Sequence, residues 1–237
     1  MGKFRAVAAI TLALAFLGGC VHHPEIPFEK TANNIKTIGI LTPGVPSGPG
    51  VILATTVGRS FGIIGALVDA GMTASRDSQF DDELKRQNFA FEDAVTKSLS
   101  DRLTAAGYTV STVPVTRKPT DFVKSYPKAD DAKVDAYLDV YYAGYGYIAA
   151  GIGSETPYRP GVALRVRLVR ARDTAVLMED TIIYNPIGTP VDTVTIAPDP
   201  DDLFQDFDAL KANPEHATKG LSKAIDQTSD TIVKLLQ

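Results

Sequence analysis

Alternating apolar and polar residues are clearest in the segment GVALRVRLVRAR, residues 161–172. Val162, Leu164 and Val166 alternate there with small or basic residues, which is typical of a strand with one buried and one solvated face. Arg172-Asp173-Thr174 predicts a turn, and residues 175–185 (AVLMEDTIIYN) return as the hairpin partner. Three further segments also predict strands: KTIGIL at 36–41, YTVSTVPV at 108–115 and AYLDVYYAGYGYIA at 136–149.

A helical period marks other parts of the chain. In the segment NFAFEDAVTKSLSDRLTAAG, apolar residues recur at i+4 steps, with Asn88 expected as the N-cap and Gly107 as the stop. Residues 59–76 (RSFGIIGALVDAGMTASR) also predict a helix, and a last helix opens at Asn213-Pro214.

An acidic segment precedes the last helix. Its aspartates lack the spacing of an EF-hand loop, which needs a glycine turn and a distal glutamate. We expect Asp201 and Asp202 to favour the start of a short helix, DDLFQDFDALK, through the helix dipole. Phe204 and Phe207 are expected to face the core.

The order of these elements predicts the fold class. We expect an α+β fold, an α/β sandwich with a mixed, largely antiparallel sheet of about five strands and amphipathic helices packed on it. Residues 36–237 are predicted to form a single domain.

The amino terminus has the features of a secretion signal. Lys3 and Arg5 precede an apolar run at 6–16, which is too short to span a bilayer, and Leu17-Gly18-Gly19-Cys20 follows. This tetrapeptide resembles the bacterial lipobox, in which the cysteine thiol receives diacylglycerol. An ordinary cleaved signal with an incidental cysteine is the alternative, but Cys20 is the chain's only cysteine and stands where the motif requires it.

These features predict residues 1–19 as a signal peptide and 20–35 as a lipidated tether. Two or more acyl chains at Cys20 hold a protein stably on a membrane. Residue 21 is valine rather than aspartate, which in the proteobacterial sorting pattern implies the outer membrane, here at its periplasmic face. Residues 21–34 lack any period, and fully extended they reach about 45 Å.

Composition argues against several kinds of function. The 24 Lys and Arg minus Lys3 and Arg5 leave 22 basic residues against 28 acidic ones, with no basic patch, so nucleic acid is not an expected partner. The only histidines are His22, His23 and His216, and no hydrolase, phosphate-loop or zinc-protease motif is present. We therefore predict a protein that is not an enzyme, with no metal and no cofactor except the covalent lipid on Cys20.

Tyrosines are concentrated in and after the segment 136–149. The predicted strand places Tyr137, Tyr141, Tyr145 and Tyr147 on one face with Asp139. Such a face can stack on glycan rings or bind a protein, because tyrosine combines contact area with a polar tip. The alternative is that tyrosine favours strands and this face packs under a helix.

Glycines are spaced regularly in the apolar segment after residue 57. Gly58, Gly62 and Gly65 allow close backbone approach, which suits a helix pair or an oligomer contact. A buried helix is the alternative. The glycines at 144 and 146 follow no phosphate-binding register and predict a strand-end bend.

The mature chain resembles an uncharacterised group of proteobacterial outer-membrane lipoproteins. The resemblance lies in IKTIGIL, GRSFGIIGALVDAG, FEDAVTKSLSDRLTAAGYTV and YRPGVALRVRLVRARDTAVLMEDTIIYNP. The architecture is also similar to the curli secretion lipoprotein and to the amino-terminal domain of the Tol periplasmic protein. This resemblance implies a periplasmic α/β module for assembly or docking, and we expect an envelope protein partner or self-association. A carrier of lipid or glycan is the alternative.

Overall fold

The computed structural model describes residues 25–54, 74–128, 132–150, 156–188, 190 and 192–237. Strands and helices follow one another along the chain in the order β1 (Thr37–Leu41), β2 (Gly50–Ala54), α2 (Ala74–Arg86), α3 (Phe91–Ala105), β3 (Thr109–Val113), β4 (Ala136–Ala150), β5 (Arg159–Arg170), β6 (Val176–Tyr184), β7 (Val194–Ile196), α5 (Phe207–Ala212) and α6 (Pro214–Leu235).

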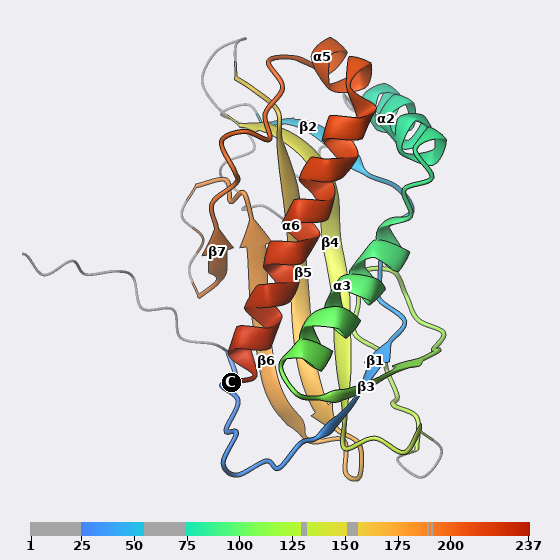
Figure 1. The fold of residues 1–237 in the computed structure, drawn as a ribbon, viewed down its shortest axis with the longest axis vertical. Coiled ribbons are helices and arrows are strands. Elements are labelled where there is room, and N and C mark those ends of the chain that lie inside the picture. Colours follow the sequence, from blue (N-terminus) through green and yellow to red (C-terminus); the bar gives the residue numbers. More distant parts are fainter. Residues whose placement is uncertain (1–24, 55–73, 129–131, 151–155, 189, 191) are drawn as a thin grey trace, which may run out of the picture.

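The seven described strands belong to one mixed sheet, in which six follow the order β3-β1-β4-β5-β6-β7 and β2 pairs with β4 outside this order (Figure 1). The long central strands β4, β5 and β6 pair antiparallel, and the shorter strands around them pair parallel. β1 and β2 both lie along β4, with the bridge of Gly44 and Tyr141 between them. Residues 37–54 therefore form one interrupted strand beside β4.

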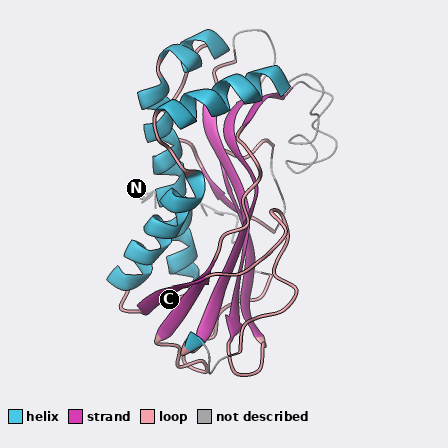
Figure 2. Ribbon diagram, turned by 90° about the vertical axis from the view of Figure 1, so that its right-hand side faces the viewer, coloured by secondary structure: helices cyan, strands magenta, loops and turns pink. Residues whose placement is uncertain are grey.

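The helices cover one face of this sheet (Figure 2). α6 crosses β5 and β6, and α3 lies beside α6 over β1 and β3 (Figure 1). The predicted apolar residues of α3 are buried at Phe91, Val95, Leu99 and Leu103, and they join one large core with the inner side chains of the central strands. Burial of these apolar faces is the main force that holds the two layers together.

The opposite face, which we call the outer face, carries a second and smaller cluster. Leu41, Val123, Tyr137 and Ala171 are buried there under the connection from β3 to β4. Asp139 is fully buried beside them.

The predicted fold class is confirmed, with several differences in detail. The sheet has seven strands rather than about five, because β2 and β7 were not predicted. The helix predicted at 59–76 lies mostly outside the described residues. The structure also has α2, most of which lies after Arg76, where the predicted helix ended. This part was not predicted because only Phe80 and Leu84 of the polar helix are buried, too few for an apolar period.

The predicted N-cap of α3 is wrong. Asn88 has a positive φ of 52° and its N–H bonds to the carbonyl of Lys85, so it ends α2. Ala90 occupies the N-cap position of α3 without a side-chain hydrogen bond. Two other expected helix boundaries are confirmed, because Gly107 takes a positive φ after α3 and Pro214 begins α6.

Candidate functional site

The residues that follow the predicted lipid anchor are bound to the sheet. Ile26 and Glu179 exchange two backbone hydrogen bonds of 3.0 Å, which adds a short antiparallel bridge to the edge of β6. The Glu25 carboxylate lies 2.7 Å from a guanidinium nitrogen of Arg165 and accepts a 3.2 Å bond from the Thr181 hydroxyl. We call residues 25–35 the N-terminal strap.

Further contacts hold the strap along its length. Phe28 and Ile35 pack against the main core, and Arg170 donates a 2.6 Å hydrogen bond to the side-chain oxygen of Asn33. From Glu25 onward the segment predicted as a free tether therefore lies against the domain. Only residues 21–24 separate it from Cys20, a reach of about 17 Å from Cys20 to Glu25.

At its Glu25 end, the strap contacts a cluster of charged and aromatic side chains on the outer face. Glu179 accepts hydrogen bonds from both Arg165 and Arg167, at 2.7 and 2.8 Å. The guanidinium of Arg167 lies 4.0 Å from the centre of the Phe122 ring, a cation–π contact. Phe122 belongs to the connection between β3 and β4, so this cluster links the strap, the sheet and that connection.

The four tyrosines predicted to share a face do not share one. The pairing of β4 with β5 shifts by one residue between Tyr142 and Gly144, which is a β-bulge. Because side chains alternate along a strand, one extra residue exchanges the faces beyond the bulge. Tyr137 therefore lies in the outer cluster, and Tyr145 and Tyr147 lie in the helix-side core.

Burial of these tyrosines supports the packing alternative. Tyr145 stacks on Phe91 with ring centres 3.7 Å apart, and burial raises the pKa of its hydroxyl to about 12. The Tyr147 hydroxyl donates to the carbonyl of Ala217 in α6 at 3.0 Å. Tyr137 is also fully buried, and only Tyr141 is partly open, edge-on to Phe122. The four side chains form no common binding surface.

The acidic segment before α6 also differs from the prediction. Asp206, not Asp201 or Asp202, caps the short helix α5, where its carboxylate accepts from the Ala209 N–H at 2.7 Å. Asp202 is buried and lies 3.4 Å from the ammonium of Lys223. Phe204 is buried as predicted. Within the described ranges, no group of three or more metal-binding side chains comes together.

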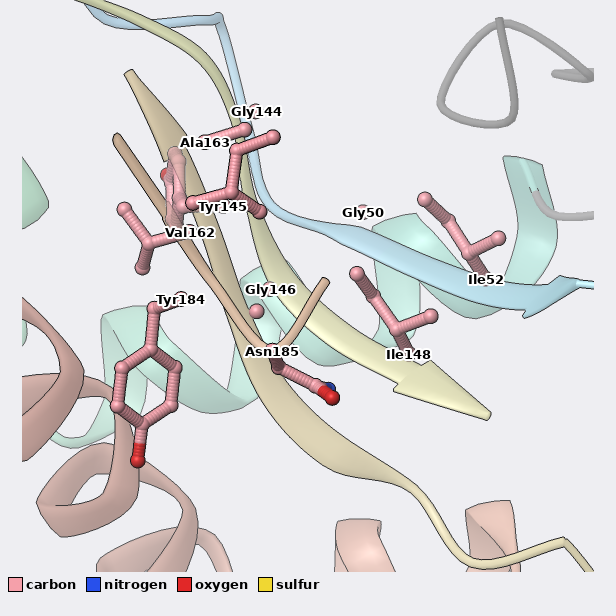
Figure 3. A pocket seen from close by; sticks show the side chains of 12 residues that line it. Gly50, Ile52, Gly144, Tyr145, Gly146, Ile148, Val162, Ala163, Tyr184 and Asn185 are labelled. Atoms are coloured by element: carbon pink, nitrogen blue, oxygen red, sulfur yellow. The ribbon is translucent and has the colours of Figure 1, made fainter. Parts of the chain in front are cut away.

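Three glycines lie side by side across the sheet at Gly50, Gly146 and Gly161. Gly146 has a φ of 145°, and a Cβ there would overlap the carbonyl of Gly50. Figure 3 labels Gly50 and Gly146 of this row, with Ile52 and Ile148 farther along the neighbouring strands. The cavity beside it has a volume of about 10 Å³, enough for one water molecule. The strand-end bend expected at Gly144 and Gly146 is replaced by a bulge within the strand, because β4 continues through both glycines to Ala150.

A larger groove lies at the other end of the sheet order, beside β3. Its volume is about 590 Å³, and it separates α3 from the carboxyl ends of β1 and β3. Its lining residues are Ile40, Leu41, Thr42, Pro43, Glu92, Asp93, Thr96, Lys97, Ser100, Asp101, Thr112, Val113 and Pro114. Crevices at the carboxyl ends of parallel strands are common binding places in α/β folds. The sequence pattern gave no signal for this groove.

Several predicted site residues lie outside the described residues: Cys20, Gly58, Gly62 and Gly65. Lipidation and the glycine contact therefore stay predictions. None of the helices within the described ranges has the length and apolarity needed to cross a bilayer.

No protein-family model and no curated protein matches the chain. Solved structures match it at low identity. The PelC dodecamer from Paraburkholderia phytofirmans is 11% identical, covers 85% of this chain and 89% of its own, and has a TM-score of 0.37. A DUF330 protein from Xanthomonas campestris is 11% identical over 90% of each chain, with a TM-score of 0.41.

The lipoprotein GNA1162 from Neisseria meningitidis is a third match, 14% identical over 62% of this chain and 81% of its own, with a TM-score of 0.27. All these TM-scores are below 0.5, so they assign no family and transfer no function. The chain is distantly similar to proteins that include a lipoprotein.

Proposed function

We propose that this chain is a non-enzymatic lipoprotein, anchored through Cys20 at the periplasmic face of the outer membrane, that docks another component of the cell envelope. Its membership of the outer-membrane lipoprotein group is part of this proposal. It takes no cofactor other than the covalent lipid, and its partner is an envelope protein or a second copy rather than nucleic acid.

The observation that carries the proposal is the position of the N-terminal strap. Because Ile26 pairs with Glu179, the anchor leaves the domain at the β6 edge and holds it within about 17 Å of Cys20. β3 lies four strand spacings away at the opposite edge, about 19 Å across the sheet. A domain fixed to the membrane at one edge and open at the other is suited to docking.

The alternative of a lipid or glycan carrier has less support. The cavity at the glycine row is far smaller than an acyl chain or a sugar ring. Of the tyrosines that suggested glycan stacking, Tyr145 and Tyr147 are buried on the helix side and Tyr137 is buried in the outer cluster. The groove beside α3, at about 590 Å³, is large enough for a small ligand, but its exposed carboxylates at Glu92 and Asp93 suit a cation better than an acyl chain.

The test is crosslinking in intact Gram-negative envelopes, with the wild-type chain beside the Cys20→Ala variant. We expect palmitate label on the wild type, recovery in outer-membrane fractions and a reproducible crosslink to one envelope component. Cys20→Ala is expected to lose the label and most of the crosslink. If the wild-type chain is recovered alone and monomeric, with lipid or sugar bound, docking is wrong and the carrier function is favoured.

A further inference from the structure

We propose that the free edge of β3, together with the groove beside α3, binds an extended segment of a partner protein that carries Lys or Arg, as an added strand. This inference rests on the proposed docking function and names its surface and the chemistry of its partner.

Part of the β3 backbone forms no hydrogen bond with another strand of the described residues. The N–H of Thr109 donates to the carbonyl of Lys36 at 2.9 Å, and the carbonyl of Val113 accepts from the N–H of Thr42 at 3.2 Å. The backbone groups of Thr109 and Val113 therefore point toward β1. Backbone groups alternate along a strand, and those of Val110 and Thr112 therefore point away from β1. Among the described residues, no strand pairs with this edge. It can accept one more strand by the mode that many peptide-binding domains use.

The edge also lacks the features that usually protect such strands. Natural proteins place lysine, proline or a bulge on an exposed edge to prevent pairing. The β3 sequence TVSTV has no charge and no proline, it pairs with β1 in an unbroken register, and its β-branched residues favour pairing. Three of its five residues are exposed. The edge thus has the properties of a docking strand rather than of a blocked one.

The charge of the groove indicates which segment fits. Lys97 is already paired with Asp101 at 2.5 Å. Glu92 and Asp93 are exposed in the first turn of α3 and have no ion pair to another described residue. Thr112 of the edge strand lines the same groove, so a side chain of an added strand can reach these carboxylates. A Lys or Arg there would complement both.

A second copy fits this surface less well. Pairing of two β3 edges would supply only uncharged residues from the partner strand and would bring two acidic groove rims together. Glu92 and Asp93 would then gain no cation, and like charges across an interface weaken it. A basic segment of a different protein is therefore the occupant that we propose.

The experiment uses the full lipidated chain in intact envelopes, with a photo-crosslinking amino acid, Ser111→p-benzoylphenylalanine, at the exposed edge. Mass spectrometry would identify the crosslinked residue of the partner. We expect one extended segment with a Lys or Arg within two or three positions of that residue. The double variant Glu92→Lys/Asp93→Lys is expected to reduce the crosslink about tenfold, and Lys→Glu in the partner to restore it.

Two further variants separate charge from backbone pairing. The matched control is Asp208→Lys/Glu215→Lys, which changes the net charge by the same amount as Glu92→Lys/Asp93→Lys but at exposed sites on α5 and α6. This control should leave the crosslink unchanged. Thr112→Pro removes an outward N–H and should abolish the crosslink. If Thr112→Pro does not fold, judged by its thermal transition, the charge reversal alone decides.

Crosslinks to β3 of a second copy or to lipid, or a crosslink insensitive to Glu92 and Asp93, would overturn the inference. Docking itself would survive these outcomes if probes on other surfaces still captured one envelope protein. If no probed surface captured any envelope component, the proposed function would fail as well.

Discussion

At the residue scale, the outer face depends on one buried ion pair. Asp139 is fully buried and its oxygens accept from Arg117 at 2.7 Å, from the Val123 N–H at 3.0 Å and from the Tyr126 hydroxyl at 3.1 Å. Arg117 also donates to the carbonyl of Thr42, the residue that follows β1. These bonds hold the connection between β3 and β4 on the sheet.

Removing the charge of Asp139 should be costly. Asp139→Asn leaves the Arg117 guanidinium buried without its carboxylate, and we expect the free energy of unfolding to fall by about 3 kcal/mol. Urea denaturation of the variant measures this. Lys97→Ala breaks an exposed pair on α3 and is the matched control, with an expected change below about 0.5 kcal/mol. Equal effects of the two variants would contradict the importance of burial.

Two glycines with positive φ allow a comparison of strain with steric overlap. A Cβ at Gly107 would touch nothing within 4 Å, whereas a Cβ at Gly146 would overlap the backbone of Gly50. We expect Gly107→Ala to cost about 1 kcal/mol and Gly146→Ala more than about 3 kcal/mol, or to prevent folding. Thermal unfolding of both variants decides. Similar transitions would mean that β2 does not lie as close to β4 as described.

The Asp135 carboxylate makes a pH-dependent contribution at the start of β1. Partial burial raises its pKa, but the N–H groups of Lys36 and Thr37, at 2.9 and 2.8 Å, outweigh this and hold the pKa below its usual value. Because its pKa is lowered in the folded state, the Asp135 carboxylate stabilises the fold at pH values above its unfolded pKa of about 3.9. This stabilisation is lost as the pH falls through the folded pKa.

Asp135→Asn should therefore cost about 1 kcal/mol at pH 7, because the carboxylate is largely open to solvent. Its stability should also depend less on pH below about 4 than that of the wild type. Denaturation curves from pH 2 to 7 measure both effects. A variant that keeps the wild-type acid dependence would assign that dependence to other carboxylates.

At the element scale, the sequence predicted most strands and helices but not where the chain changes face. The alternation in β5 and the i+4 steps in α3 are strong because each has one apolar face. The bulge at Tyr142 and Gly144 leaves no signal in the residue pattern, since tyrosines lie on both sides of it. The prediction that the four tyrosines share one face was wrong because of this bulge.

Long-range contacts could not be predicted either. Residues 25–35 lack any period, and their place on the sheet depends on Glu179 and Arg165, far along the chain. The three-residue β7 is too short for a pattern, and it forms because β6 offers an edge beyond Thr181. The groove beside α3 likewise depends on how α3 lies over the strand ends.

The strap should detach when its backbone bridge is broken. Ile26→Pro removes the N–H that donates to Glu179, and we expect faster hydrogen exchange at the Glu179 amide and faster proteolysis within residues 25–35. Ile26→Ala keeps the N–H and is the matched control. Hydrogen exchange followed by mass spectrometry measures the difference. Equal protection in the two variants would show that side-chain contacts, not the bridge, hold the strap.

At the scale of the whole molecule, the two sides of the sheet order are unequal. β6 has Ile26 on its outer edge near Glu179 and β7 on the same edge from Ile182 onward. β3 pairs only with β1 among the strands that the structure describes. The proposed lipid anchor and the proposed docking edge therefore lie on opposite sides of the sheet.

This inequality has a consequence for assembly. A protein with two open strand edges can join copies of itself without limit, as amyloid does. Here the strap bridge at Ile26 and the three-residue β7 lie along the outer edge of β6, and both are shorter than the five-residue β3, so among the described residues the far side offers the next copy no edge strand as long as β3. We therefore expect the strap and β7 to disfavour continued pairing at the far edge, so that an added strand at β3 completes the sheet rather than starting a chain of copies.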